Sequence, residues 1–270
     1  MKITVVTATY NSARTLRDTL ESVLSQTYGD MEYILTDGGS TDGTLDLVRE
    51  YEPRFQGRMR WVSEPDGGIY DAMNKGIRMA TGEVVGLLNS DDVFCDAHVL
   101  EDIAACFDAR QVDCVYGNLL FCRDNDLDRI VRIWKGSPYS EGAFMRGWHP
   151  AHPTFYARRT CYEQYGYYDT GVRVSADFDL MLRFLDIHKV SNAYLDRFIV
   201  KMRMGGESTG NLRLIVTGNR NILRAMRKNG YPAGLPFLMR RLLPKVWNRL
   251  KTPFVYKKYL TSRDGSRRDG

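Results

Sequence analysis

The sequence predicts an α/β protein with a mostly parallel central sheet flanked by helices. Over the first hundred residues, strand-like and helix-like segments alternate in units of about 30 residues, which is typical of βαβ crossovers. Polar loops rich in Gly, Asp and Asn separate these segments. A chain of 270 residues, 43% of them hydrophobic, is also long enough to bury a full core.

The elements of this half follow from periodicity and turn signals. An apolar run over residues 3–8 predicts a strand, and apolar side chains from Leu16 onward recur at helical spacing, with Asn11 or Ser12 as the expected cap. The stretch "EYILTDGGSTDGT" predicts a second strand that ends in Asp37, then a Gly-rich turn and a helix. The segments "MRWVSEPDGG", "IYDAMNKGIRMA" and "EVVGLLNSDD" predict a strand, an amphipathic helix and another strand.

Two adjacent acids, Asp91 and Asp92, follow the apolar run 84–88 that ends this last strand. Like charges so close repel each other, and such a pair is usually neutralised by a cation, a metal or a proton. The alternative is that Ser90 or Asp91 caps a helix that runs from about residue 93 to 107. Both interpretations are compatible with the local sequence.

Four polar loops follow the four predicted strands: "ATYN", "TDGGSTDG", "SEPDGG" and "NSDD". Ligands of open α/β sheets bind beyond the carboxyl ends of the strands. We therefore expect the four loops to converge on one crevice.

The regular alternation stops at about Val112. The stretches "CVYGNLLF" and "RIVRIW" predict two strands joined by a charged turn, and residues 136–159 are rich in Gly, Pro, His and aromatic residues. The stretch "SADFDLMLRFL" predicts a helix with an apolar face. This half is expected to shape a second subsite.

Cysteine usage and the absence of targeting signals indicate a cytoplasmic protein. The five cysteines form no CxxC pair and are odd in number, as expected of reduced thiols. The N-terminus leads directly into a strand, without the apolar region and cleavage site of a signal peptide. No apolar run approaches the roughly 18 residues of a membrane span.

Positive charge is concentrated at the C-terminus. Residues 235–270 contain ten Lys or Arg and two Asp, whereas the first 234 residues carry a net charge of −3. Aromatic and aliphatic residues interleave with these cations, which is typical of segments at an anionic membrane surface. Nucleic-acid binding and a helix packed on the body are the alternatives, and the acidic body argues against nucleic acid.

The four loop motifs resemble those of family 2 glycosyltransferases with the GT-A nucleotide-sugar fold. They occur as "TATYN", "DGGSTDGT", "EPDGGIYDAMNKGI" and "NSDD", in the family's order. The stretches "HPTFYARR", "SADFDLMLR" and "MRMGGES" extend the resemblance to about residue 210. The second and third motifs are most similar in sequence to those of the bacterial branch that transfers galactose or a similar sugar during O-antigen and exopolysaccharide assembly.

The resemblance implies a UDP-sugar donor and a divalent cation, Mn²⁺ or Mg²⁺, at its diphosphate. Such cations prefer oxygen ligands and commonly take one or two carboxylates from the protein. The resemblance assigns Asp92 as the direct metal ligand and Asp91 as a ribose or metal contact. It assigns nucleotide-sugar contacts to Ala8, Tyr10, Asp37, Gly38, Asp66, Asn74, Lys75 and Asp91.

Two of these assignments have complications. Asp37 is expected to accept the N3 hydrogen of uracil, but family members often have a second acid where this chain has Gly38. The turn also needs glycine for its backbone conformation. On the helix that follows the third strand, Asp71 and Lys75 stand at i and i+4, so they can simply form an exposed ion pair.

In the second half, the resemblance makes Asp177 the base that takes the proton of the acceptor hydroxyl. One base opposite the leaving group implies in-line displacement with inversion. Asp179 is a candidate for orienting the acceptor. The alternative is that Ser175 or Asp177 simply caps the predicted helix.

Three further contacts are expected with acceptor or phosphate, from Trp148, His152 and Arg203. Trp148 stands in an aromatic loop suited to stacking on a sugar, and His152 can reach the metal or diphosphate. The pair His149 and His152 could also suggest a zinc site, but the sequence offers no third ligand at a known zinc spacing.

These observations predict a catalytic domain over residues 1–210, with a donor half (1–110) and an acceptor half (111–210). A basic helical extension over 211–262 and a disordered tail over 263–270 follow. The predicted reaction is inverting transfer of a hexose (galactose, glucose or an N-acetylated analogue) to a glycan or a polyprenyl-diphosphate-linked acceptor. The predicted location is the inner face of the cytoplasmic membrane. The alternatives are a nucleotidyltransferase, a signalling receiver domain and a catalytically silent sugar-nucleotide binder.

Overall fold

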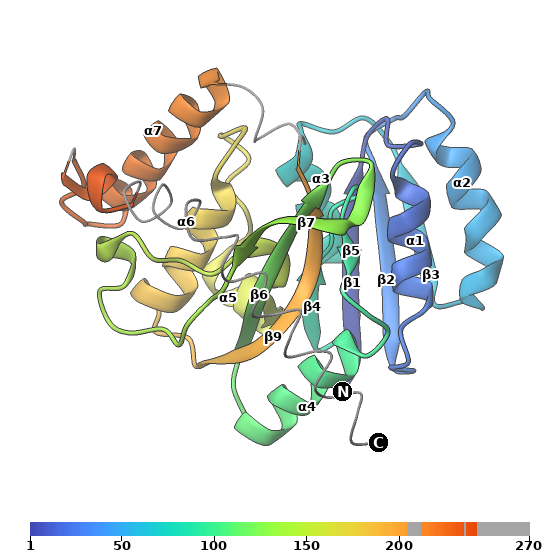
Figure 1. Ribbon diagram of the computed structural model, residues 1–270, viewed down its shortest axis with the longest axis horizontal. Helices are drawn as coiled ribbons and strands as arrows, with labels where there is room; N and C mark the ends of the chain where they lie inside the picture. The colour runs from blue at the N-terminus through green and yellow to red at the C-terminus, as the bar shows by residue number, and fades with distance from the viewer. Residues whose placement is uncertain (205–211, 235, 242–270) are drawn as a thin grey trace.

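The structure is a computed structural model that describes residues 1–204, 212–234 and 236–241. Most of the "MRMGGES" stretch, the basic segment from residue 242 and the tail over 263–270 lie outside these residues. The molecule is a mixed α/β fold around one curved sheet (Figure 1). Along the path β3-β2-β1-β4-β8-β6-β9-β5, each strand is hydrogen-bonded to its neighbours, and β7 pairs with β6.

The first half of the sheet is parallel, as the sequence predicts. Its strands are β1 (Ile3–Thr9), β2 (Met31–Asp37), β3 (Met59–Ser63) and β4 (Val84–Leu87). β1 pairs in parallel with both β2 and β4, and β2 pairs in parallel with β3. The carboxyl ends of the four strands therefore lie at the same edge of the sheet.

Helices cover both faces of this parallel region. They are α1 (Leu16–Leu24), α2 (Thr44–Tyr51), which continues into the 3-10 turn η1 (Glu52–Phe55), and α3 (Ile69–Met79). Side chains alternate along β1, so that Val5 joins the core that contains α1 and α2, whereas Val6 joins the core that contains α3. Burial on both faces explains why β1 and β2 consist of buried residues throughout.

The predicted helix caps are wrong in two places. Residues 93 and 94 form the short strand β5 (Val93–Phe94), which pairs with β9, and α4 (Val99–Arg110) begins only at Val99. Ser90 and Asp91 therefore cap no helix. Asn11 and Ser12 do not cap α1 either, because a turn intervenes in which the Ser12 carbonyl accepts from the backbone N–H of Thr15.

The second half of the sheet is mixed. It contains β6 (Cys114–Arg123), β7 (Asp126–Trp134), β8 (Tyr156–Arg158) and β9 (Asn192–Arg203). β8 joins the halves, because it runs antiparallel to both β4 and β6. Gly86 of β4 makes this junction possible, since a Cβ there would lie 2.0 Å from the Cε1 atom of Tyr156.

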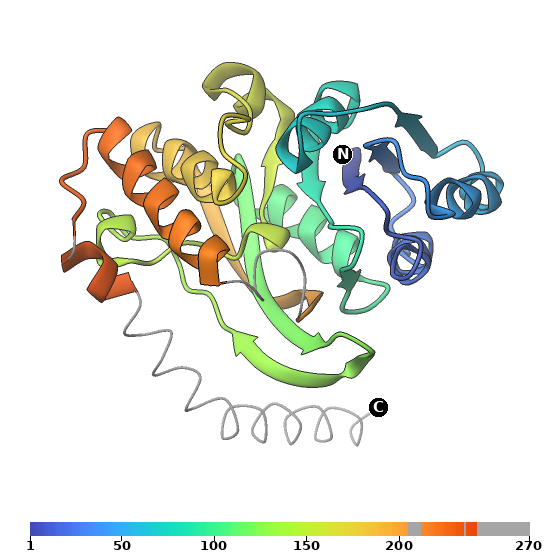
Figure 2. The ribbon, with the colours of Figure 1, turned by 90° about the horizontal axis from the view of Figure 1, so that it is seen from above.

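The remaining helices pack beside this mixed region. They are the 3-10 turns η2 (Phe144–Arg146) and η3 (His152–Thr154), then α5 (Arg159–Tyr165), α6 (Ala176–Leu182), the π-helical turn η4 (Arg183–Ile187) and α7 (Leu212–Lys228). α7 lies alongside α6, and β6 and β7 form a long hairpin that curves away from them (Figure 2). Within the described ranges, every helix is too short or too polar to cross a bilayer.

Candidate active site

The loops after β1, β2, β3 and β4 contact one another, which confirms their predicted convergence. The backbone N–H of Asn11 donates to Ser40 Oγ at 2.7 Å, and that of Ser12 donates to Thr44 Oγ1 at 2.8 Å. The hydroxyls of Ser12 and Ser90 lie 2.9 Å apart and join the first loop to the fourth. Ser63, at the end of β3, donates from Oγ to the Asp37 carboxylate at 2.7 Å.

Asp37 is buried and its carboxylate is occupied by its own loop. Oδ2 accepts from the backbone N–H groups of Gly39 and Ser40, at 3.0 and 2.9 Å, and from Ser63 Oγ. Oδ1 accepts from the Ser40 hydroxyl. The residue expected to recognise uracil thus holds the turn after β2 in shape.

Asp66 and Tyr10 meet at Gly38. A Cβ on Gly38 would lie 2.5 Å from Asp66 Oδ2 and 3.4 Å from Tyr10 Cδ2. Asp66 is held by the backbone N–H of Gly68, which donates to Oδ1 at 2.8 Å, while the Tyr10 side chain is 64% exposed. The resemblance implies a second acid where this chain has Gly38. Gly38 instead leaves room for the carboxylate of Asp66, from the loop after β3. Ala8, at 7% exposure, lies in the core below.

Asp91 and Asp92 differ in their access to solvent. Asp92 is fully buried, with Asn89 Nδ2 donating to one carboxylate oxygen at 2.8 Å and the backbone N–H of Arg203 donating to the other at 3.2 Å. Asp91 beside it is only partly buried. Burial raises the pKa of Asp91, and burial together with the charge of Asp91 raises the pKa of Asp92 well above its usual range.

This pair is a chemically suitable place for a divalent cation. Carboxylate oxygens are the donors that Mg²⁺ and Mn²⁺ prefer, and a cation would relieve the repulsion between the two adjacent acids. In the part of the chain that the structure describes, no cluster of three or more His, Cys, Asp or Glu side chains could hold a metal. A cation here would take its other ligands from phosphates and water.

Arg203 closes the back of this pair. Its guanidinium is buried and binds the Asp18 carboxylate of α1 and the carbonyl oxygen of Asp124 at the tip of the β6–β7 hairpin. Its backbone N–H contacts Asp92. The guanidinium expected at the donor phosphates therefore ties β9 to α1 and the hairpin.

Asn74 and Lys75 of α3 also make structural contacts. Asn74 is buried, and its side chain pairs with the backbone N–H and C=O of Tyr168, at 3.0 and 2.9 Å. Lys75 Nζ donates to the Pro65 carbonyl at 3.1 Å and lies 3.0 Å from Glu64 and 3.6 Å from Asp71. The expected i,i+4 pair is present, and both residues fix neighbouring loops to α3.

Asp177 stands in the first turn of α6 beside His152. Asp177 Oδ2 lies 3.3 Å from His152 Nδ1, and the two side chains are 20% and 26% exposed. Ser175, the residue before α6, has a left-handed φ of 69° and makes no side-chain cap hydrogen bond. Non-glycine residues adopt this conformation at a cost, and such strain is common at functional sites.

Tyr70 and Tyr168 lie beside Asp177, and neither was predicted from the sequence. Their rings stack with centroids 5.6 Å apart, and the Tyr70 hydroxyl contacts the backbone of Ala176. Burial raises the pKa of Tyr70 well above its ordinary value, and the Asp177 charge adds to this rise. Tyr70 lies inside the "EPDGGIYDAMNKGI" motif, so its position in the motif was an available signal.

Asp179 and Trp148 are part of the packing around the site. Asp179 forms a buried ion pair with Arg183 Nε at 2.9 Å and accepts from Nδ2 of Asn229, the residue after α7, at 3.1 Å. Trp148 packs among the rings of three aromatic residues, Tyr116, Tyr139 and Phe144. Asp179 thus anchors α6 to α7, and Trp148 braces the loop that leads to His152.

The chain thus joins a parallel sheet end that carries the acids Asp91 and Asp92 to a mixed half that carries the pair of Asp177 and His152, in one α/β fold. The family model described as "Glycosyl transferase family 2" matches residues 4–165. A relative from Mycobacterium bovis, "PGL/p-HBAD biosynthesis glycosyltransferase", is 34% identical over 187 residues, which is 66% of this chain and 68% of the relative. The chain belongs to glycosyl transferase family 2.

Solved structures show the same fold at low sequence identity. The mannosyltransferase PcManGT from Pyrobaculum calidifontis, in complex with GDP-Man and Mn²⁺, has a TM-score of 0.64 and 18% identity, covering 100% of this chain and 76% of its own. S. aureus TarS 1–349, in complex with UDP-GlcNAc, has a TM-score of 0.61 and 20% identity, covering 93% of this chain and 73% of its own. The match spans 43% of the longer TarS chain.

Proposed function

We propose that this chain is an inverting, metal-dependent glycosyltransferase that transfers a hexose from a UDP-sugar to a hydroxyl group of a glycan or lipid-linked acceptor. The observation that carries the proposal is the presence of two separate carboxylate sites, Asp91 with Asp92 on the donor half and Asp177 with His152 on the acceptor half. Sugar transfer needs a counter-charge at the leaving diphosphate and a base at the attacking hydroxyl.

On the donor side, the resemblance makes Asp92 the direct metal ligand, but Asp91 is the more accessible carboxylate and is the direct ligand that we propose. Asp92 lies behind it with both oxygens accepting hydrogen bonds, so its role is to complete the negative charge and to orient the loop. When bound, the cation supplies the counter-charge to the diphosphate. Asn89 and the backbone N–H of Arg203 hold the Asp92 carboxylate in place.

We assign the nucleotide to the surface formed by Tyr10, Gly38 and Asp66. The exposed ring of Tyr10 offers a stacking face, and Asp66 offers a carboxylate beside it. A uracil N3–H can donate to such an oxygen. Asp37 supports this surface from below through its hydrogen bonds to the loop after β2.

On the acceptor side, Asp177 accepts the proton of the attacking hydroxyl. His152 Nδ1 contacts Asp177 Oδ2 and thereby fixes the carboxylate, leaving the other oxygen to face the acceptor. The stacked pair of Tyr70 and Tyr168 limits access of water to this side. The acceptor oxygen attacks the anomeric carbon opposite the departing nucleotide diphosphate as Asp177 takes its proton, so an α-linked donor gives a β-linked product.

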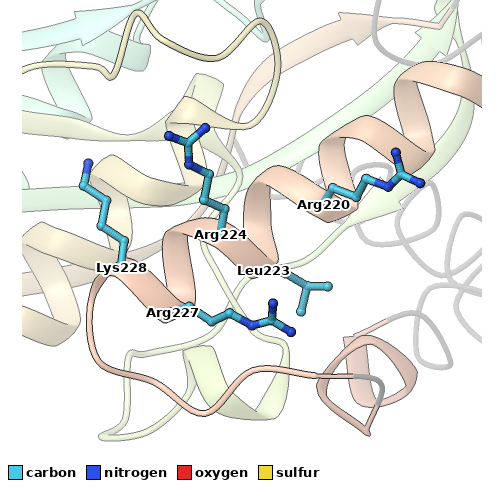
Figure 3. Close-up of a pocket in the computed structure, with 5 residues that line it drawn as sticks. All are labelled: Arg220, Leu223, Arg224, Arg227 and Lys228. Atoms are coloured by element: carbon cyan, nitrogen blue, oxygen red, sulfur yellow. The ribbon is translucent and has the colours of Figure 1, made fainter.

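We infer that the basic C-terminal part of the chain meets the anionic cytoplasmic face of a membrane, where a polyprenyl-diphosphate-linked acceptor would be found. Support comes from the cationic side chains of α7, which line a surface hollow of about 530 Å³ (Figure 3). Arg224 and Lys228 lie on one side of the helix, and Leu223 and Arg227 on the other. Such a mixed surface suits anionic headgroups.

A screen of UDP-sugars and GDP-mannose with Mn²⁺ tests the proposal. We expect one UDP-sugar to raise the melting temperature and to release UDP when an acceptor glycoside is present. Stabilisation by GDP-mannose alone would contradict the assignment of uracil. Nucleotide binding without turnover on any acceptor would indicate a silent binder, and release of pyrophosphate would indicate a nucleotidyltransferase.

A further inference from the structure

Arg241 carries a buried charge that the site described above does not use. The residue is 8% exposed, although it belongs to the basic C-terminal part of the chain. Nη1 donates to Asn219 Oδ1 of α7 at 2.9 Å, whereas Nε is buried without a hydrogen-bond partner. Among the residues that the structure describes, no carboxylate lies within ion-pair distance of the Arg241 guanidinium.

The surroundings of Arg241 fix it beside the acceptor half of the site. A Cβ on Gly147 would lie 2.7 Å from Arg241 Cα, so the chain around Arg241 packs directly against the loop that carries Trp148. Gly147 has a φ of 87°, a conformation that favours glycine. The guanidinium carbon lies 5.8 Å from the ring centroid of Phe178, the residue after Asp177.

A guanidinium in this position needs an anion. Arginine stays protonated in proteins, and an isolated buried charge is expensive unless it is paired. Burial lowers the pKa of Arg241, and Asp177 is the charged group that acts in the opposite direction. Asp177 is beyond ion-pair distance and Nε has no hydrogen-bond partner, so the guanidinium keeps an unused donor for an oxyanion that a substrate would bring.

We propose that Arg241 binds a phosphate group of a substrate on the acceptor side of the site. This assignment rests on the proposed function, in which both substrates carry phosphates. Asp177 is the charged neighbour of Arg241, and in an inverting displacement the base stands opposite the leaving diphosphate. The geometry therefore favours a phosphate of the acceptor, and the donor diphosphate is the other source. The planar fork of arginine suits two phosphate oxygens.

Inorganic pyrophosphate is the direct probe, and it is added to the full chain. EDTA removes divalent cations, so that pyrophosphate cannot bind through a metal at Asp91 and Asp92. Arg241→Gln removes the charge, and Arg240→Gln, at the exposed neighbouring position, is the matched control. We expect calorimetry to show pyrophosphate binding to the wild type and R240Q, and binding at least about tenfold weaker to R241Q. Equal affinity of R241Q and R240Q would overturn the proposal.

Two further arms identify the source of the phosphate. If it belongs to the acceptor, R241Q raises KM for a diphosphate-linked acceptor and not for a neutral alkyl glycoside, while UDP affinity in Mn²⁺ is unchanged. If it belongs to the donor, R241Q weakens UDP and leaves uridine binding unchanged. Failure of every UDP-sugar with the wild type would refute the proposed function, but the pyrophosphate result would still stand.

A second variant covers the case in which R241Q does not fold. Gly147→Ala keeps the arginine but places a methyl group against its backbone, which must displace Arg241. We expect the same loss of pyrophosphate binding in G147A. Pyrophosphate affinity equal to that of the wild type in G147A would overturn the proposal.

Discussion

Asp92 combines complete burial with an acidic neighbour, which makes its protonation state depend on what binds nearby. Its raised pKa means that the metal-free fold retains a proton on this pair to higher pH than an exposed aspartate would. A group with a raised folded pKa contributes stability at low pH, and the contribution is lost as pH rises through that pKa. A bound divalent cation favours the deprotonated pair and reverses this loss.

We therefore predict that stabilisation by Mn²⁺ increases with pH. The shift in melting temperature on adding Mn²⁺ should be small at about pH 5 and larger at about pH 8, because protons compete with the cation at Asp91 and Asp92. Thermal denaturation of the wild type and of Asp91→Asn measures it, with Asp46→Asn, an exposed acid on α2, as control. An equal shift at both pH values, or a full shift in D91N, would contradict the metal assignment.

At the level of elements, the loops after β2 and β3 interlock at Gly38. A Cβ added at Gly38 would meet the carboxylate at the end of the Asp66 side chain. This carboxylate can rotate away from the added methyl group at little cost to folding. The position of Asp66 relative to Tyr10 would change, however. The nucleotide surface that we propose thus depends on the absence of a side chain at Gly38.

We predict that Gly38→Ala weakens UDP binding by about tenfold or more while changing the free energy of unfolding by less than about 1 kcal/mol. Gly29→Ala is the matched control, since a Cβ at Gly29 meets no atom within 4 Å. Calorimetric titration with UDP and urea denaturation measure the two quantities. Wild-type affinity in G38A would show that the Asp66 surface does not bind the nucleotide.

The attachment of α6 to the loop after α5 depends on the buried ion pair of Asp179 and Arg183. The two side chains are 6% and 14% exposed, and Arg183 also donates to backbone carbonyls of the loop after α5, including that of Gly166 at 3.1 Å. Removing Asp179 leaves the guanidinium without its counter-charge. The position of Asp177, two residues earlier on the same helix, depends on this anchor.

We predict that Asp179→Ala lowers the free energy of unfolding by about 3–5 kcal/mol, the usual cost of breaking a buried pair. Asp46→Ala, which removes an exposed pair with Arg49, should cost less than about 1 kcal/mol. Urea denaturation of both variants measures the difference. A loss in D179A as small as that in D46A would mean that this pair does not anchor α6.

The elements that the sequence predicted best are those whose signals are local. The order β1 to β4 and the end of β2 at Asp37 follow from periodicity and turn residues within short windows. The alternative interpretation placed Val93 in a helix, because its strand partner β9 lies about a hundred residues away along the chain. Long-range pairing overrode a plausible local cap.

The same limit applies to the site. The four loop motifs and the placement of Asp177 in a helix were predictable, because motif order and turn chemistry are properties of the sequence. The structural partners of Asn74 and Arg203 were not, since these contacts span 94 and 185 residues. Arg241 was missed because its burial depends on packing against Gly147 and α7.

At the scale of the whole molecule, the fold is shared with proteins that bind different donors. One structural neighbour is in complex with UDP-GlcNAc and another with GDP-Man and Mn²⁺, at similar TM-scores. The overall architecture therefore does not select the nucleotide. Selection falls to a few side chains at the strand ends, of which Tyr10 and Asp66 are our candidates.

The first 234 residues of the chain are slightly acidic and residues 235–270 strongly basic, but α7, within the first part, also carries Arg220, Arg224, Arg227 and Lys228. The donor and metal contacts that we propose lie on the body, whereas Arg241 and α7 bring cations to the acceptor half. A phosphorylated acceptor would approach from the basic side.

The central claim is that Asp177 is the base of a sugar transfer in which Asp91 and Asp92 hold the metal end of the donor. The most direct measurement compares UDP binding and sugar transfer in the wild type and in Asp177→Asn, with the best donor from the screen and Mn²⁺. We predict that D177N binds UDP with an affinity within about twofold of the wild type and loses transfer by at least about 100-fold. Transfer by D177N at the wild-type rate would contradict the account.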